Sequence, residues 1–218
     1  QAFDAGAWLS ACDELLATAR DVERALARPL DALGFGGGFG WPVYDGDPRF
    51  DLDAAARGLR ERLAAEATPR RGSIELGRWL VAGCGVYLTR VVDHKDSGGK
   101  RHAVLDGGMH HCGAAAGLGA IVRRAYAIVR ADAPRAHGDT PVTLGGPLCT
   151  PADRFGKDLP LPPLRPGDLI AVLNTGAYGL SFSPLAFLGH PSPAELVCDA
   201  GAAQLARERG APEDVLRG

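Results

Sequence analysis

The 218-residue sequence predicts two structural classes in succession, an α/β part over residues 1–83 and a β part over residues 84–218. Two observations support this division. In the first part, apolar residues at helical spacing alternate with short apolar runs, a pattern typical of α/β folds. From residue 84 onward, period-2 alternation, hairpin turns and prolines replace the helical spacing.

Helices and strands are expected to alternate in the α/β part. Apolar residues recur at helical spacing from Ala7 to Ala27 and predict the first helix. No strand is expected before it. Asp51 is a plausible N-cap for a second amphipathic helix. The expected elements after the first helix are strands at 30–35 and 73–75 and helices at 51–65 and 77–82.

The β part is predicted from strands and one strong turn. Asp96-Ser97-Gly98-Gly99-Lys100 is a hairpin turn because its glycines supply the backbone angles that tight turns need. The proline-rich segment 159–168 is an extended connector. The expected strands are 85–93, 101–105, 141–144, 169–173 and 194–198.

Composition narrows the function classes. The formal net charge is -2, from 24 Lys and Arg against 26 Asp and Glu, so neither a nucleic acid nor a membrane surface is indicated as a partner. The apolar runs are too short to span a bilayer. The five cysteines are scattered without a CxxC pair, which argues against a disulfide framework or zinc site and favours a reducing, cytoplasmic compartment.

A glycine run carries the first chemical signal. Gly36-Gly37-Gly38 follows a predicted strand, where main-chain N–H groups without neighbouring Cβ atoms can hold a phosphate. The alternative interpretation is a flexible turn. Glu75 ends the next predicted strand and Arg78 follows it, so a carboxylate and a guanidinium are expected near the same strand ends.

Three further clusters lie in the β part. The loop 145–153 bears the thiol of Cys149, which is otherwise interpreted as a small buried residue. Tyr178 lies next to a glycine and is either a ligand contact or a turn residue. His110-His111-Cys112 ends a predicted strand, but adjacent residues lack the spacing of a metal site, so no metal is expected.

Together these motifs resemble the fold-type III pyridoxal-phosphate decarboxylases, which include the diaminopimelate, ornithine and arginine decarboxylases. The resemblance implies the C-terminal part of an alanine-racemase-like (β/α)8 barrel followed by a β-domain, with residues 175–190 returning to the cofactor site. It also implies a homodimer with shared active sites. The motifs, in chain order, are Gly36-Gly37-Gly38-Phe39, Glu75-Leu76-Gly77-Arg78, Gly146-Pro147-Leu148-Cys149-Thr150-Pro151-Ala152-Asp153 and Ala177-Tyr178-Gly179.

The resemblance implies a role for each residue. The loop Gly36–Gly38 would bind the phosphate of pyridoxal 5'-phosphate, with Arg78 facing it and the Tyr178 hydroxyl touching it. Glu75 is similar to the carboxylate that pairs with the pyridine nitrogen. Cys149 resembles the cysteine that enters the partner's active site and protonates the product-forming carbanion.

The Schiff-base lysine of this family has no counterpart in the sequence. The chain contains only Lys95, Lys100 and Lys157, and none follows a predicted barrel strand. The resemblance therefore implies that an N-terminal half carries this lysine.

Departures from the family pattern bear on the substrate. Thr150, expected with Asp153 to contact the substrate, stands where enzymes for basic amino acids carry a carboxylate. Ala115–Gly119 lacks the arginine that grips a distal carboxylate and suggests a roomy pocket. The pair Arg123-Arg124 could face a phosphopantetheine phosphate, or form a solvated helix end.

These features are closest to a branch that includes the butirosin-type glutamyl-carrier-protein decarboxylase and the exosortase-associated decarboxylases. The expected activity is decarboxylation of an α-amino acid or of a carrier-bound aminoacyl group in a biosynthetic pathway. Two alternatives stay open: a decarboxylase of free diaminopimelate or ornithine, and a non-catalytic homologue acting as a binding protein.

Overall fold

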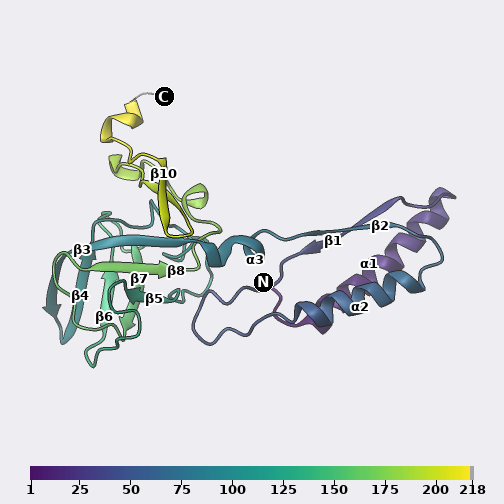
Figure 1. The fold of residues 1–218 in the computed structure, drawn as a ribbon, viewed down its shortest axis with the longest axis horizontal. Helices are drawn as coiled ribbons and strands as arrows, with labels where there is room; N and C mark the ends of the chain where they lie inside the picture. Colours follow the sequence, from purple (N-terminus) through teal and green to yellow (C-terminus); the bar gives the residue numbers. More distant parts are fainter. Residues whose placement is uncertain (217–218) are drawn as a thin grey trace. The chain divides into compact units, whose positions relative to one another are not determined.

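The computed structural model describes residues 1–216 and divides into two compact units (Figure 1). Unit 1 is Gln1–Ala82 and unit 2 is Gly83–Gly218. Each unit has a buried core of its own.

Unit 1 contains two helices packed beside two parallel strands. Its elements are α1 (Ala5–Leu26), β1 (Ala32–Gly37), α2 (Leu52–Ala65), β2 (Arg71–Glu75) and α3 (Arg78–Val81), followed by a 3-10 turn over Ala82–Cys84. Figure 1 shows α1 and α2 side by side, with β1 and β2 running next to them. The alternation of strand and helix matches the expected α/β class.

Side-chain caps explain where the two long helices begin. The Asp4 carboxylate accepts a hydrogen bond from Ala7 N–H at 2.6 Å, and Asp51 accepts one from Ala54 N–H at 2.9 Å. Both aspartates satisfy amide groups that have no partner within the helix. The prediction of Asp51 as an N-cap is confirmed.

The core of unit 1 gathers apolar residues from both helices and from β1. Phe39 lies at its centre, edge-on to Trp8 at 4.9 Å between ring centroids and stacked on Phe50 at 4.1 Å. Ala2 also forms an isolated parallel bridge with Phe39, and no strand precedes α1 among the described residues. The buried residues are Trp8, Cys12, Leu16, Ala19, Leu33, Phe35, Phe39, Phe50, Ala55 and Leu59.

Unit 2 is built on a six-stranded mixed sheet with a separate hairpin. The strand order is β5-β8-β3-β4-β6-β7, and β4 and β6 are its only parallel pair among the described residues. The strands are β3 (Val86–Ser97), β4 (Lys100–Leu105), β5 (Ile128–Arg130), β6 (Val142–Gly145), β7 (Arg154–Leu159), β8 (Leu169–Leu173), β9 (Glu195–Asp199) and β10 (Ala202–Arg207).

The long strand β3 joins the two sides of this sheet. Its first residues pair with β8 and its later residues pair with β4, with a register shift between Val91 and Asp93. An extra residue in one strand bends it and increases its twist. The predicted turn between β3 and β4 is confirmed, with Gly98 and Gly99 both at positive φ.

Three strands of unit 2 were not expected from the sequence. β5 has only three residues, β7 contains a glycine and three charged residues, and β10 begins directly after the turn that ends β9. None of these segments has the alternation that signals a half-buried strand, so pairing with a neighbouring strand decides their structure. None of the described helices is both long and apolar enough to cross a bilayer.

Candidate functional site

The ends of β1 and β2 bring the glycine run and Glu75 together. The two strands are parallel, and Gly37 is the pairing partner of Glu75. The carboxyl ends of parallel strands meet at one edge, so the glycine loop, Glu75 and the start of α3 belong to the same edge of unit 1. The expectation that the carboxylate lies near the same strand end as the glycines is confirmed.

Two different physical reasons favour glycine in this run. Gly36 and Gly38 have φ of 64° and 77°, a left-handed conformation that only glycine adopts without strain, and no atom lies within 4 Å of an added Cβ. At Gly37 an added Cβ would lie 1.8 Å from the Glu75 carbonyl oxygen. The open space beside Gly36 and Gly38 leaves their main chain accessible to an anion.

The glycine loop is anchored at its C-terminal end. Phe39 is buried in the core directly after Gly38. The Gly38 carbonyl accepts a hydrogen bond from Ala2 N–H, and Gly40 N–H donates to the Ala2 carbonyl, both at 2.7 Å. The loop is therefore an ordered surface, which argues against the alternative of a flexible turn.

Glu75 and Arg78 differ in exposure. Glu75 is exposed at the end of β2, and its Oε1 lies 3.8 Å from where a Cβ on Gly34 would be. Arg78 is the first residue of α3 and is partly buried. Trp79, the next residue, packs edge-on against Phe39 and Trp41 at 6.4 and 6.5 Å between centroids, which fixes this helix turn on the core.

Unit 2 presents Cys149 on a short loop between β6 and β7. The thiol is exposed, and Thr150 next to it is partly buried. The Thr150 hydroxyl accepts a hydrogen bond from Ala152 N–H at 3.2 Å. The exposed thiol is a position from which a proton donor can act, in contrast to the alternative of a small buried residue.

Asp153 closes the base of the same loop. It is 5% exposed, and its carboxylate accepts hydrogen bonds from Leu148 N–H at 2.9 Å and from Met109 N–H at 2.6 Å. The Gly146 N–H also donates to the Asp153 carbonyl at 3.1 Å. A direct substrate contact by this carboxylate, expected from the sequence, stays a prediction.

Tyr178 lies in the turn that follows β8. It is exposed, has a φ of 55°, and packs edge-on against Phe182 at 5.9 Å between centroids. The turn is held close to the start of β3, because a Cβ on Gly85 would lie 2.2 Å from the Gly176 nitrogen. A non-glycine residue in this conformation is uncommon and marks a position of interest for function.

The polar cluster at His110 and His111, noted from the sequence, bonds to Tyr87 and Pro191, which the sequence did not indicate. The Pro191 carbonyl can only accept, so His111 Nε2–H donates to it at 2.9 Å and His111 Nδ1 accepts from the Tyr87 hydroxyl at 3.1 Å. His110 is 1% exposed and lies 3.8 Å from His111 between ring centroids. Its Nδ1 has no hydrogen-bond partner among the described residues.

Burial sets the ionisation of this cluster. Desolvation, helped by His111 and His190, lowers the pKa of His110 to about 3. Desolvation also lowers the pKa of His111 and raises that of Tyr87. These side chains are therefore neutral at pH 7. No group of three or more metal-ligating side chains is arranged for a metal ion within residues 1–216.

Two interpretations of the substrate region are wrong. Ala115, Ala116 and Gly117 are buried within unit 2 and do not line an open pocket. Arg123 lies in irregular chain instead of at a helix end. Its stem packs over Gly117, and its Nη1 donates to the Ala152 carbonyl at 3.2 Å.

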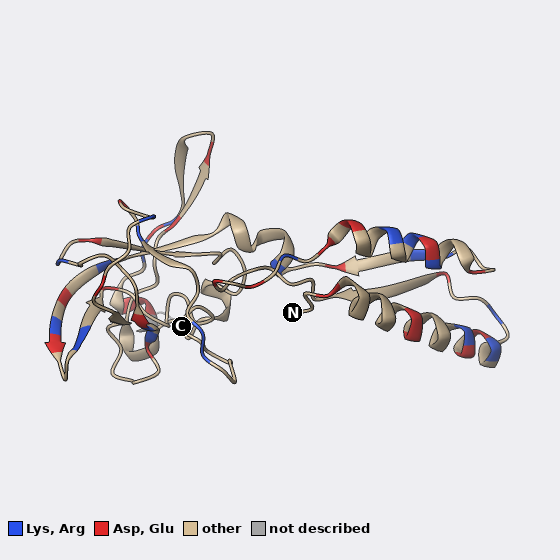
Figure 2. Cartoon of the chain, turned by 90° about the horizontal axis from the view of Figure 1, so that it is seen from below, with Lys and Arg blue, Asp and Glu red and all other residues tan. Residues whose placement is uncertain are grey.

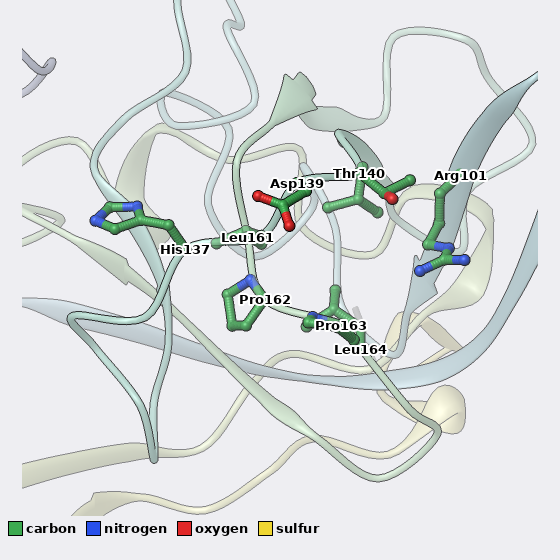
Figure 3. A pocket seen from close by; sticks show the side chains of 10 residues that line it. Arg101, His137, Asp139, Thr140, Leu161, Pro162, Pro163 and Leu164 are labelled. Atoms are coloured by element: carbon green, nitrogen blue, oxygen red, sulfur yellow. The ribbon is translucent and has the colours of Figure 1, made fainter.

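A small cavity of about 190 Å³ lies elsewhere in unit 2 (Figure 3). The proline-rich connector forms one side of it, and Arg101 at its rim is held by Asp96 at 3.0 Å. None of the site residues predicted from the sequence lines it. Its lining residues are Arg101, His137, Gly138, Asp139, Thr140, Val142, Leu161, Pro162, Pro163 and Leu164.

Comparison with curated proteins identifies relatives of known activity. The chain is 40% identical over 205 residues to the L-glutamyl-[BtrI acyl-carrier protein] decarboxylase of Niallia circulans, covering 90% of this chain and 48% of that protein. It is 34% identical over 207 residues to the diaminopimelate decarboxylase of Streptomyces coelicolor, covering 88% and 46%. The chain thus spans about half the length of these relatives.

Solved structures share the fold. Diaminopimelate decarboxylase from Helicobacter pylori, complexed with L-lysine, superposes with a TM-score of 0.80 at 29% identity, covering 98% of this chain and 49% of that chain. Lysine/ornithine decarboxylase from Vibrio vulnificus, complexed with putrescine, has a TM-score of 0.70 at 21% identity and covers 84% and 48%.

These relationships confirm the predicted fold class, the last part of an α/β barrel followed by a β-domain. The family model described as "Pyridoxal-dependent decarboxylase, C-terminal sheet domain" matches residues 18–176, which is more than half of the sequence. The chain therefore belongs to the family of pyridoxal-dependent decarboxylases.

Proposed function

We propose that this chain works within a pyridoxal-phosphate-dependent decarboxylase that removes the α-carboxylate of an aminoacyl substrate as CO₂. One observation carries the proposal. Gly37 pairs with Glu75 across parallel strands, so an accessible glycine main chain and an exposed carboxylate share one edge of unit 1. Membership of the pyridoxal-dependent decarboxylase family supports the same cofactor.

The residues present fit the cofactor. The open main chain at Gly36 and Gly38 would hold the phosphate through N–H groups, and Arg78 would add a positive charge. Glu75 would accept a hydrogen bond from the protonated pyridine nitrogen and keep the proton there. When bound, pyridoxal phosphate would supply a sink for the electrons left at the α-carbon as CO₂ departs.

Cys149 is the proposed proton donor. The bond between the α-carbon and the carboxylate breaks, and a C–H bond forms at the same carbon with the thiol proton of Cys149. The thiolate then regains a proton from solvent. We assign this action to the active site of a second copy of the chain in a homodimer, while the Tyr178 hydroxyl contacts the cofactor phosphate and residues 175–190 reach the cofactor site.

The Schiff-base lysine is proposed to come from sequence outside this chain. Lys95, Lys100 and Lys157 all lie in unit 2, on β3, β4 and β7. All three side chains are exposed on the sheet strands. None is in unit 1, where the glycine loop and Glu75 lie.

The substrate side chain is proposed to be neutral or masked, as in a glutamyl group held as a thioester on a carrier protein. Thr150 offers a hydroxyl, which cannot neutralise a distal ammonium ion. Arg123 presents a guanidinium beside the Cys149 loop, where it suits the phosphate of a phosphopantetheine arm. Five free cysteines are consistent with the proposed cytoplasmic location.

The test uses the full-length protein. We expect the visible absorbance of bound pyridoxal phosphate and CO₂ release from glutamyl-carrier protein, with much lower kcat/KM for free ornithine, lysine and diaminopimelate. Arg78→Ala should weaken cofactor binding by about 1.5–3 kcal/mol, the contribution of one charge-assisted contact. Arg123→Ala should raise KM for the carrier substrate only, with the exposed Arg135→Ala as control.

The outcomes separate the candidate functions. Efficient turnover of free diaminopimelate, with an inert carrier substrate, would place the protein among the diaminopimelate decarboxylases. A protein that binds no cofactor and releases no CO₂ from any substrate would be a non-catalytic homologue, and the proposal would be wrong.

A further inference from the structure

Asp153 is a buried carboxylate without a cationic partner. It is 5% exposed, and no ion pair reaches it in the part of the chain that the structure describes. Moving a charge out of water raises the free energy of the folded state unless hydrogen bonds to that charge compensate the loss. Here two main-chain amides do so, Leu148 N–H to Oδ2 and Met109 N–H to Oδ1.

These two amides belong to the Cys149 loop and to the turn after β4. Leu148 directly precedes Cys149, and Met109 begins a turn after β4, 44 residues away from Asp153 in the chain. A single side chain thus joins the thiol-bearing loop to a distant turn. Because carboxylate bonds to main-chain N–H groups are strong and directional, they restrict where Leu148 and the next residue can move.

Two glycines make room for this carboxylate. A Cβ on Gly108 would lie 2.4 Å from both carboxylate oxygens, and one on Gly146 would lie 2.2 Å from Oδ2. Both distances are too short for any real contact. The backbones of the two loops therefore close around Asp153, and Gly146 additionally donates its N–H to the Asp153 carbonyl at 3.1 Å.

We infer that Asp153 is a positioning residue that fixes Cys149 at the geometry needed to deliver its proton. The inference rests on the proposed function for its kinetic test, because it acts through the proton donor assigned there. Asp153 does not touch the substrate in this scheme. In place of the predicted substrate contact, Asp153 acts indirectly. It holds the geometry of the loop that carries Cys149.

The first experiment is a double-mutant cycle in the full-length protein. Asp153→Asn keeps the size but replaces one acceptor oxygen by an N–H₂ group that opposes a main-chain N–H. We expect kcat to fall by about 10- to 100-fold, the effect of misplacing a catalytic group by a fraction of an ångström to 1 Å, with KM and the cofactor spectrum unchanged. In a Cys149→Ala background the same substitution should change kcat less than about twofold.

A second measurement does not need activity. The alkylation rate of Cys149 by iodoacetamide, followed at the peptide level, should change several-fold in Asp153→Asn, while the rates at the exposed Cys84 and Cys198 stay constant. If Asp153→Asn fails to fold, Gly146→Ala disturbs the same contact and takes its place in both assays. Asp168→Asn is the matched control, since it also removes a carboxylate bond to a main-chain N–H, that of Arg165 at 2.8 Å.

An equal loss of kcat in both backgrounds, or an unchanged alkylation rate at Cys149 in the folded variant, would overturn the inference. If the Cys149→Ala background retains no measurable turnover, the alkylation rate decides. Absence of decarboxylation in the unmodified protein would refute the proposed function, and the alkylation rate alone would then test whether Asp153 positions the loop.

Discussion

Both units have ion pairs, but the two units bury different kinds of polar side chain. Unit 1 joins its helices through ion pairs, and Figure 2 shows blue and red segments of ribbon interleaved along α1 and α2. Arg62 holds Asp13 through two hydrogen bonds of 2.7 and 2.8 Å, and Arg70 binds both Glu23 and Glu66. Unit 2 instead buries the neutral rings of His110 and His111 and one carboxylate, Asp153. Tyr87, which bonds His111, is partly buried.

The difference predicts distinct responses to acid. In unit 1, the hydrogen bond from Arg70 lowers the pKa of Glu23, so its stabilisation is present above the unfolded value and is lost as pH falls through the lower folded value. In unit 2, burial lowers the pKa of His110 to about 3, so protons bind the unfolded state first. Unit 2 should therefore weaken at a higher pH than unit 1.

The largest expected loss of stability comes from substituting Gly37, the glycine that pairs with Glu75. Gly37→Ala would place a Cβ 1.8 Å from the Glu75 carbonyl oxygen and force β1 and β2 apart. We expect a loss of about 3 kcal/mol or more in the free energy of unfolding, measured by urea denaturation, and loss of cofactor binding. Gly34→Ala on the same strand is the control, because its nearest contact would be an ordinary 3.7 Å. Similar stabilities of the two variants would show that the strand edge is not rigid.

Removing Arg70, the cation that binds two carboxylates in unit 1, should have the next largest effect on stability. The Arg70 side chain is only 2% exposed. Arg70→Ala removes its ion pairs with Glu23 and Glu66. We expect a clear fall in Tm at pH 7 that shrinks as the pH drops below about 4, where the carboxylates take up protons. The exposed pair of Arg24 and Asp21 provides the control, and Arg24→Ala should change Tm little. A fall in Tm that is the same at pH 7 and pH 3 would argue against an ionic cause.

A smaller effect is expected from His110. His110→Phe keeps an aromatic ring in the buried position and removes the group that binds a proton in the unfolded state. The decline of Tm between about pH 6.5 and 4.5 should become shallower. The charged or titratable neighbours that face this ring are His111 and His190, and they stay in place. The exposed His137→Asn should leave the slope unchanged, whereas an unaltered slope in His110→Phe would shift the cause to His111.

The smallest expected effect is a difference in reactivity between the buried thiols of Cys12 and Cys112. Each unit buries one cysteine. Burial raises the pKa of Cys12 in unit 1. In unit 2, burial raises the pKa of Cys112 to about 11. At pH 8 both should resist iodoacetamide until the protein is denatured. Labelling of Cys112 before Cys12 during a urea titration would show that unit 2 opens first, and simultaneous labelling would indicate a single cooperative transition.

Local sequence was sufficient for the elements that local chemistry controls. The cap at Asp51, the turn at Gly98 and Gly99 and the spacing of apolar residues in α1 each depend on near neighbours in the chain. The order of the glycine run and Glu75 also followed from the sequence, since parallel strands place their carboxyl ends together. The strand bounds shifted slightly, with β1 extending to Gly37.

Tertiary structure decided what depends on distant segments. β7 lacks strand periodicity and exists because β6 pairs with it, and Ala115 and Ala116 became core residues because unit 2 folds over them. The hydrogen bond from Met109 N–H to Asp153, between residues 44 positions apart, could not be predicted from local sequence. Sequence therefore determined which chemical groups the chain carries and how they are ordered. Only the folded chain determined which of them are exposed to a substrate and which hold the others in place, since burial and long-range hydrogen bonds do not exist before the chain closes.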